Sequence, residues 1–396
     1  MSTLKLSDKQ IEGLERIAQI HGYASADAYL LALAEKGIAF DVSHILAEAR
    51  EKPIHRRRET ALGEIWEGDA LTWMTAQPDS SLDLIMTSPP FGLIRKKSYG
   101  NEAADDYCNW FRPFAEEFRR LMKDSASLVI DIGGAWEKGK PVRSLYHYDL
   151  LVMLVREYGF HLCLEHYWFN PAKLPSPVEW CNIRRVRVKD AVNCVWWLSK
   201  TPWPKCSNMR VLQPYSDRMK NLHINGYQAM LRPSGHDISD KFSVAHKGAI
   251  PPNLLAIPNT ESNSAYSQFC RENDHPIHPA RFPAKLPEYF IRMLTDKGDK
   301  AYDPFSGSFT TGRVSEELGR KWVGTEMRED YILGGLARFQ PDAPNILTTG
   351  TNARYSIYPP CAMGDTDDVP LVDDGGLKRR DTNANKAMEQ EATYES

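Results

Sequence analysis

The sequence predicts an α/β fold built on a mostly parallel sheet. From about residue 62, short apolar segments of strand length alternate with longer amphipathic segments of helix length. Two of the strands run directly into loops rich in Ser, Pro or Gly, at 88–91 and 306–312. This alternation predicts helices on both faces of the sheet. In such sheets ligands bind beyond the carboxyl ends of the strands, where both loops are expected.

The elements of the core domain, residues 61–355, are assigned from hydrophobic spacing and flanking turn residues. Four segments carry apolar side chains at helical spacing, namely 107–122, 148–158, 286–295 and 311–318. Seven shorter segments, bounded by turn residues, have the apolar character of strands: 64–68, 82–87, 127–132, 161–169, 191–198, 300–305 and 321–325.

Residues 1–60 are predicted to form a small helical appendage with a charged linker. A short extended piece precedes two helices, at 7–22 and 25–37. Strand, helix, turn and helix in this order resemble ribbon-helix-helix modules, which pair as homodimers through the strand. A plain two-helix appendage is the alternative. Residues 48–59 have the charge pattern of a linker.

Charge is distributed unevenly along the chain of 396 residues. The formal net charge of −3 conceals a basic middle, because residues 173–250 carry 13 Lys and Arg against 5 Asp and Glu. This is the footprint expected of phosphate binding. Residues 361–396 carry 4 against 9, so residues 356–396 are predicted to be an acidic, disordered tail.

Composition argues against several classes of protein. There is no apolar run of about 18 residues and no signal-like N-terminal core, so a cytoplasmic protein without a membrane span is expected. Seven cysteines without a CxxC pair indicate reduced thiols rather than a disulfide framework. Cys270, His275 and His278 are close in sequence, but chance explains this spacing better than a metal cluster, so no metal is predicted.

The segment 82–92, LDLIMTSPPFG, predicts a buried strand that ends in a stiff loop. Pro89 and Pro90 fix φ and lack backbone donors, so the carbonyls of Ser88 and Pro89 remain free to accept hydrogen bonds. The Ser88 hydroxyl adds an acceptor and Phe91 a flat apolar surface. Acceptors beside an aromatic ring suit a planar group with an NH2. Taken alone, such a tetrapeptide is more often an ordinary turn.

A second strand-end loop predicts a nucleotide-type ligand. The strand at 300–305 leads into SGSFTTG at 306–312 and then a helix, a geometry typical of such sites. Glu326 stands 19 residues after Gly307, where this architecture binds a ribose diol. The turn lacks the signatures of both phosphate-binding and dinucleotide loops. Its opening acid, Asp303, instead fits a ligand with a positive amino-acid end, and S-adenosylmethionine has that chemistry.

These two loops, in this order, resemble those of the DNA amino-methyltransferases of the β class, a permuted arrangement in which the catalytic loop precedes the cofactor turn. Further segments resemble the cytosine-N4 enzymes in particular: 95–101, 168–171, 173–177, 187–193 and 278–288. The resemblance runs from about residue 63 to 339. It implies a Rossmann-like S-adenosylmethionine-dependent methyltransferase fold, in which a basic insertion at about 201–274 recognises the target sequence.

The resemblance assigns roles to the matched positions. Ser88, Pro89, Pro90 and Phe91 would hold the target base. The cofactor would contact a larger set: Asp69, His278, Ala280, Phe282, Pro283, Asp303, Phe305, Gly307, Ser308 and Glu326. Within it, Glu326 would take the ribose hydroxyls, Asp69 would approach the adenine, and 278–283 would line the methionine end. Phe309 departs from the family pattern, which usually has a small or polar residue there.

Double-stranded DNA is the implied partner. Six polar or basic side chains are the predicted DNA contacts: Arg184, Arg185, Lys189, Arg232, Ser234 and His236. A solvated strand face is the alternative for the residues near 184–189. A companion restriction endonuclease acting on the same site is a further implied partner, although an enzyme without one fits the sequence equally well.

The implied reaction moves a methyl group from S-adenosylmethionine to the N4 amine of a cytosine flipped out of the duplex. The N4 lone pair is delocalised into the ring, so hydrogen bonds to the Ser88 Oγ and the Pro89 carbonyl would free it, while Phe91 stacks on the base. Cytosine-C5 methylation is disfavoured, since its nucleophile would be Cys361 in the acidic tail. Adenine-N6 methylation and an inactive DNA-binding regulator that uses residues 1–40 remain alternatives.

Overall fold

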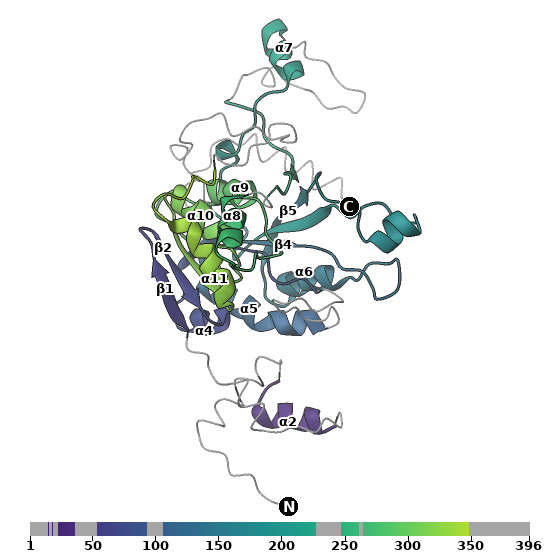
Figure 1. The fold of residues 1–396 in the computed structure, drawn as a ribbon, viewed down its shortest axis with the longest axis vertical. Coiled ribbons are helices and arrows are strands. Elements are labelled where there is room, and N and C mark those ends of the chain that lie inside the picture. The colour runs from purple at the N-terminus through teal and green to yellow at the C-terminus, as the bar shows by residue number, and fades with distance from the viewer. Residues whose placement is uncertain are drawn as a thin grey trace, which may run out of the picture.

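The computed structural model describes residues 15, 18, 23–35, 54–92, 106–226, 247–260 and 264–347. Within these residues the chain forms a mixed sheet of nine strands, in the order β1-β2-β9-β8-β3-β4-β6-β5-β7, with helices packed against it (Figure 1). The predicted α/β class is confirmed. No helix in the described part of the chain is long and apolar enough to cross a membrane.

All seven predicted strands and all four predicted core helices are present, with small shifts at their ends. The strands are β1 His55–Glu59, β2 Gly63–Glu67, β3 Leu82–Thr87, β4 Met122–Ile132, β5 His161–Phe169, β6 Val192–Ser199, β7 Leu254–Ala256, β8 Lys300–Asp303 and β9 Lys321–Glu326. The helices are α2 Ala26–Glu35, α4 Ala70–Thr75, α5 Tyr107–Leu121, α6 Tyr146–Arg156, α7 Asp217–Asn225, α8 Ala265–Glu272, α9 Lys285–Leu294, α10 Thr310–Glu317 and α11 Glu329–Leu336, with short turns η2 Glu179–Ile183, η3 Asn208–Arg210 and η6 Ala337–Phe339.

The sheet is mostly parallel, as predicted. The neighbours β2, β9, β8, β3 and β4 run in one direction, and β7 runs parallel to β5. β1 and β6 are antiparallel to the strands beside them. The carboxyl ends of β2, β9, β8, β3 and β4 therefore meet at one edge of the sheet.

The apolar run in β3 is explained by burial on both faces. Ile85 packs into one core with helices α4, α5 and α6, while Leu84 and Met86 pack into a second core with α9 and α10. A strand covered on both sides needs apolar residues at consecutive positions rather than in alternation. β3 is consequently a central strand, and the loop that follows it is held at the middle of the sheet.

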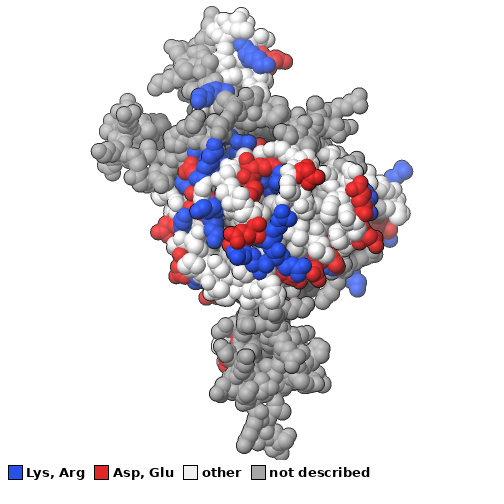
Figure 2. Space-filling view, turned by 60° about the vertical axis from the view of Figure 1, so that its left-hand side comes forward, with Lys and Arg blue, Asp and Glu red and all other residues white. Residues whose placement is uncertain are grey.

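The linker predicted at 48–59 is wrong in its second half, because residues 55–59 form the edge strand β1. Arg57 donates to Glu67 at 2.6 Å and to Glu329 at 2.8 Å, and Arg58 donates to the Phe339 carbonyl at 2.9 Å. The face turned toward the viewer in Figure 2 interleaves basic and acidic side chains. An edge strand tolerates such charge because one of its sides is hydrated. The sheet thus begins before the predicted boundary at residue 60.

Several sequence predictions fall outside the described residues. They include the extended piece at 3–6, most of the helix at 7–22 and the tail at 356–396. Helix α2 lies within the second predicted N-terminal helix, at 25–37. Within the predicted insertion at 201–274, the structure describes η3, α7, β7 and α8, none of which the sequence predicted.

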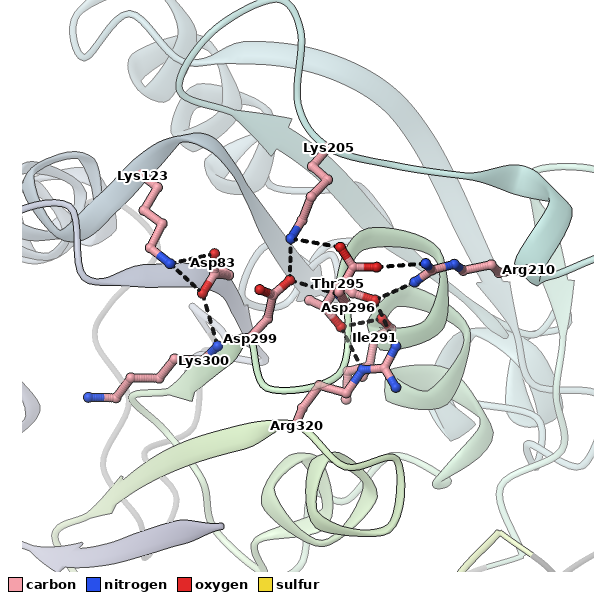
Figure 3. A network of polar contacts seen from close by, with 10 residues as sticks. All are labelled: Asp83, Lys123, Lys205, Arg210, Ile291, Thr295, Asp296, Asp299, Lys300 and Arg320. Carbon is pink, nitrogen blue, oxygen red and sulfur yellow. Dashed lines mark hydrogen bonds and ion pairs between the residues drawn. The ribbon is translucent and has the colours of Figure 1, made fainter. Parts of the chain in front are cut away.

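A polar network ties the loops at the amino ends of the strands, opposite the edge described above (Figure 3). Arg210 is 1% exposed and donates to the Thr295 carbonyl at 2.7 Å and to Asp296 Oδ1 at 2.6 Å. Arg320 donates to the same carbonyl at 2.7 Å. Lys205 pairs with Asp296 Oδ2 at 3.2 Å. The first part of the inserted region, which follows β6, is anchored here.

Arg210→Met is expected to lower the free energy of unfolding by about 3 kcal/mol, because it removes a buried cation that donates to both the Thr295 carbonyl and Asp296. Lys220→Met removes an exposed pair with Asp217 at 3.0 Å and should change stability by less than about 0.5 kcal/mol. Urea unfolding of both variants measures the difference. Equal losses of stability in the two variants would show that the buried network stabilises the fold no more than an exposed ion pair does.

Candidate active site

The two loops singled out in the sequence leave neighbouring strands at the same edge. β3 and β8 pair in parallel, with Leu84 opposite Ala301. At the ends of these strands, Thr87 Oγ1 donates to Asp303 Oδ1 at 2.8 Å. The Ser-Pro-Pro-Phe loop and the glycine turn therefore follow neighbouring strands at the carboxyl edge of the sheet, where the sequence placed both.

Asp303 holds these strand ends together from within the protein. Its carboxylate is 3% exposed, and besides the bond from Thr87 it accepts from Phe305 N at 3.1 Å and from Thr311 Oγ1 at 2.7 Å. Burial raises its pKa to about 6, against the lowering effect of these hydrogen bonds. Asp303, which the sequence analysis assigned to the cofactor, therefore also links β3, the glycine turn and α10 through hydrogen bonds.

Ser88 is oriented by Asp131, a residue that the sequence analysis missed. Ser88 Oγ donates to Asp131 Oδ2 at 3.0 Å, and Asn193 Nδ2 donates to Asp131 Oδ1 at 3.1 Å. Asp131 is 2% exposed, and burial raises its pKa to about 6, while the bonds from Asn193 and Ser88 and the charge of Lys173 lower it. A hydroxyl that donates its only hydrogen to a carboxylate keeps its lone pairs for another donor.

The rest of the Ser-Pro-Pro-Phe loop is held by aromatic side chains. Tyr107, which is buried, donates its hydroxyl hydrogen to the Pro90 carbonyl at 2.8 Å. The Phe91 ring lies against Gly133, where an added Cβ would stand 2.6 Å from Phe91 Cε2. Tyr146 donates to the Gly133 carbonyl. The Pro90 carbonyl is thus occupied by a donor from the protein, while Ser88, two residues earlier, is partly exposed.

The glycine turn lies beneath His278 and beside Glu326. Gly307 has φ +51°, and an added Cβ would stand 2.9 Å from His278 Nε2. Glu326 Oε2 accepts from Gly307 N at 2.9 Å, and burial raises the pKa of this carboxyl. Burial also lowers the pKa of His278 to about 4, so its imidazole is neutral at pH 7. The structure therefore brings together three residues that the sequence assigned to the cofactor.

Asp69 reaches the same edge through the pairing of β2 with β9. Gly68 N donates to the Glu326 carbonyl at 3.0 Å, which places Asp69 one residue from that contact. Asp69 caps α4, where its Oδ2 accepts from Thr72 N at 2.9 Å. The Asp69 carboxylate is therefore held in one orientation near Glu326.

Phe309, the departure from the family pattern, fits because two glycines make room for its ring. It begins α10 in the left-handed conformation, with φ +57°, and is 0% exposed. An added Cβ at Gly324 would stand 2.9 Å from its ring, and one at Gly335 would stand 2.5 Å away. A large residue at this point of the turn therefore depends on small neighbours on β9 and α11.

Helix α8, absent from the prediction, clamps the segment 278–283 onto the turn. Tyr266 OH accepts from His278 N at 3.1 Å, and the guanidinium groups of Arg281 and Arg338 lie over its ring, 5.1 and 4.8 Å from the centroid. Arg338 also donates to the Ser308 carbonyl at 2.8 Å. Of the other predicted contacts, Ala280 is exposed, Phe282 and Phe305 are partly buried and Pro283 is buried.

The arrangement suits S-adenosylmethionine better than a phosphate-bearing nucleotide. In a phosphate loop the N–H at the position of Gly307 would face an anion. Here it donates a hydrogen bond to the Glu326 carboxylate. A partly exposed carboxylate at this position repels phosphate and accepts hydrogen bonds from hydroxyl groups. Among the described residues no cluster of His, Cys, Asp and Glu could hold a metal ion.

Three of the predicted DNA contacts lie on the exposed segment between β5 and β6. Arg184 Nε pairs with Glu179 at 2.7 Å, and Lys189 Nζ donates to the Pro171 carbonyl at 3.2 Å. Arg185 is exposed and adopts φ +55°. The other three, Arg232, Ser234 and His236, lie outside the described residues.

Comparison with known proteins agrees with this geometry. The model of the N6/N4 methyltransferase family, described as DNA methylase, matches residues 82–336. The chain belongs to this DNA methylase family. It is 51% identical over 283 residues to the type II methyltransferase M.PvuII of Proteus hauseri. The aligned region covers 71% of this chain and 84% of that protein.

Other relatives are more distant or add structural support. The type II methyltransferase M.BglII of Bacillus subtilis is 24% identical over 277 residues, covering 68% of this methylase and 67% of that protein. The solved structure of the cytosine-N4-specific PvuII DNA methyltransferase matches with a TM-score of 0.59 and 42% identity, covering 74% of this chain and 93% of that one.

Proposed function

We propose that this methylase transfers the methyl group of S-adenosylmethionine to the exocyclic N4 amine of a cytosine flipped out of double-stranded DNA. One observation carries the proposal: Ser88, held by the buried Asp131, lies beside the Pro89 carbonyl on the loop next to the Gly307 turn. The resemblance to M.PvuII supports the same assignment, since its solved structure is described as cytosine-N4-specific.

The catalytic loop acts on the amine through two acceptors. Ser88 Oγ, whose hydrogen is donated to Asp131, and the Pro89 carbonyl each take one N–H of the amine. Both bonds localise the nitrogen lone pair, which conjugation with the ring otherwise withdraws. The proton that the amine loses passes through Ser88 to Asp131, whose pKa of about 6 lets it accept and release protons near neutrality.

The cytosine must be flipped out of the duplex before its amine can reach Phe91 and the two acceptors of the loop. The Phe91 ring is supported from behind by Gly133 and offers a stacking surface for a pyrimidine. Within a duplex the amine is paired and its face is covered by neighbouring bases, so it reaches these acceptors only after extrusion. The catalytic contribution of the chain is then mainly positioning.

S-adenosylmethionine supplies, when bound, a sulfonium methyl group. Glu326 accepts hydrogen bonds from the ribose hydroxyls, and Asp69 approaches the adenine. Ala280, Phe282 and Pro283 follow the clamped His278 and line the methionine end. Phe305 and Ser308 complete the turn around Gly307, while Asp303 fixes its base. The neutral imidazole of His278 adds no positive charge beside the sulfonium.

The chain order supports assignment to the permuted β class. β3, which carries the catalytic loop, precedes β8, which carries the cofactor turn, although the two strands are neighbours in the sheet. Residues of about 201–274 lie between these halves, and in this proposal they form the target-recognition region. Arg184, Arg185 and Lys189 contact the DNA backbone, as do the groups at 232–236.

Incubating unmodified DNA with radiolabelled S-adenosylmethionine, followed by digestion to nucleosides and mass analysis, tests the function. N4-methylcytosine is the expected product. N6-methyladenine would overturn the choice of base. Absence of transfer to any DNA would favour the inactive regulator instead. Mapping the modified positions also identifies the recognised sequence.

Two partners belong to this proposal. A companion endonuclease that cuts the same unmodified site would make the enzyme protective of host DNA. A second copy of the chain would pair through the N-terminal segment, if this forms a ribbon-helix-helix module. We expect deletion of residues 1–52, which spares β1, to shift the oligomeric state measured by light scattering or to weaken DNA affinity. If neither changes, the segment has no part in assembly or binding.

A further inference from the structure

The segment at 170–191, between β5 and β6, exposes apolar side chains beside the proposed active site. Asn170 N donates to the Ala191 carbonyl at 2.9 Å and closes its base. Leu174 is 81% exposed and Val188 is 87% exposed, the highest values among the large hydrophobic residues that the structure describes. Val178, Ile183 and Val186 of the same segment are also exposed, and apolar exposure gathered in one place marks an interaction site.

Hydrogen bonds hold the two arms of the segment together. Lys189 Nζ donates to the Lys173 carbonyl at 3.3 Å, so the residue after Val188 reaches the residue before Leu174. Asp190 N donates to the Ser176 carbonyl at 3.2 Å, and Asn182 Nδ2 donates to the Pro175 carbonyl at 3.2 Å. These bonds across the segment hold the arms in place and leave the apolar side chains outside.

The segment is anchored next to the residues that orient Ser88. Asn193, which donates to Asp131, lies two residues beyond its closing bond. Asp190 pairs with Arg143, and an added Cβ at Gly134 would overlap that guanidinium at 1.9 Å. Gly134 follows Gly133, the residue that supports Phe91. One end of the segment is thus continuous with the pocket proposed for the flipped base.

The charges around Leu174 and Val188 suit a polyanion. Both acids of the segment are engaged, Glu179 with Arg184 at 2.7 Å and Asp190 with Arg143. Arg185 and Arg187 are exposed. Apolar side chains flanked by arginines match a duplex that offers stacked bases between two rows of phosphates.

We propose that Leu174 and Val188 form an apolar wedge that enters the base stack of duplex DNA beside the target and occupies the space that the flipped cytosine leaves. The inference rests on the proposed function and extends it to the step before chemistry. Extrusion breaks pairing and stacking. Burying two exposed apolar side chains in the vacated space offsets part of that cost.

The test uses the double variant Leu174→Ser/Val188→Ser in single-turnover methylation of an oligonucleotide that carries the mapped site. One duplex pairs the target cytosine with guanine, and a second places an abasic site opposite it, so that extrusion needs no unpairing. On the paired duplex the variant should be slower by at least about tenfold, and on the abasic duplex within about twofold of the unaltered enzyme.

Val152→Ser is the matched control, since Val152 is an exposed valine on α6, and both of its rates should stay within about twofold. Equal losses on both duplexes would overturn the wedge and leave only a general binding role, and an unimpaired rate on the paired duplex would also overturn it. Both results presuppose methylation by the unaltered enzyme. If that enzyme methylates neither duplex, the proposed function itself fails and the wedge with it.

Discussion

Ser88→Ala is expected to lower the single-turnover rate of methyl transfer by about 10²- to 10³-fold. The substitution removes the acceptor that Asp131 orients and leaves the amine with the Pro89 carbonyl alone. Affinity for S-adenosylmethionine should be unchanged, because Ser88 lies on the loop after β3, whereas the glycine turn is held by bonds from Thr311 to Asp303 and from Gly307 to Glu326. Rapid-quench kinetics with radiolabelled cofactor, together with calorimetric titration of the cofactor, measure both quantities.

Ser125→Ala provides the comparison for this experiment. Ser125 lies near the amino end of β4, at the edge of the sheet opposite the Ser-Pro-Pro-Phe loop. Its substitution should leave the rate within about twofold. A Ser88→Ala protein as active as the unaltered enzyme would remove the hydroxyl from the mechanism, and a proportionate loss of cofactor affinity would indicate damage to the fold instead.

Asp131→Asn is expected to slow methyl transfer by about 10- to 100-fold and to change its pH dependence. The ionised carboxylate accepts the Ser88 hydrogen. An amide can donate to Ser88 instead, which turns the hydroxyl hydrogen toward the N–H groups of the base. Ser88 would then compete with the amine as a donor rather than accept from it.

The sign of the pH effect follows from the raised pKa. Burial, the largest cause, raises the pKa of Asp131 to about 6, so the carboxyl is protonated below that pH and ionised above it. The rate of the unaltered enzyme should therefore rise as pH increases through about 6 and then level off. Asp131→Asn should lose this inflection.

A second buried acid, Asp303, would produce an inflection at the same pH, so the pH profile of Asp131→Asn is needed to tell the two acids apart. Burial also raises the pKa of Asp303 to about 6, and its protonation would weaken the bonds from Thr87 and Thr311. If the inflection survives in Asp131→Asn, Asp303 or another group is responsible and Asp131 has no titrating role in the rate. Measuring cofactor affinity across the same pH range separates the two, since Asp303 supports the turn.

Local chemistry made much of the fold predictable. The apolar run of β3 and the glycine turn before α10 can each be recognised from a few consecutive residues, because strand burial and tight turns restrict which side chains fit. β1 escaped prediction since four of its five residues, His55, Arg56, Arg57 and Arg58, have the composition of a linker. Its strand character comes from pairing with β2 and from ion pairs to other elements.

The candidate site was predictable only where its residues are contiguous. Phe309 departs from the expected pattern, and its fit became evident only from Gly324 and Gly335, which lie on two other elements. Asp131 is the one acid in the buried part of β4, residues 126–132, a signal that could have marked it. Tyr266 carries no sequence signal, because the two arginines that its ring contacts come from separate segments.

The sequence by itself determined two chemical units, a proline-stiffened loop that offers acceptors and a glycine turn that opens with an acid. It did so because backbone restrictions of Pro and Gly act within a few residues. Only the tertiary structure decided that Asp131, 43 residues away, orients Ser88, and that Leu174 and Val188 are exposed on the segment that leads to Asn193. Sheet order and side-chain burial set those neighbours, and both are properties of the packed chain rather than of any local stretch.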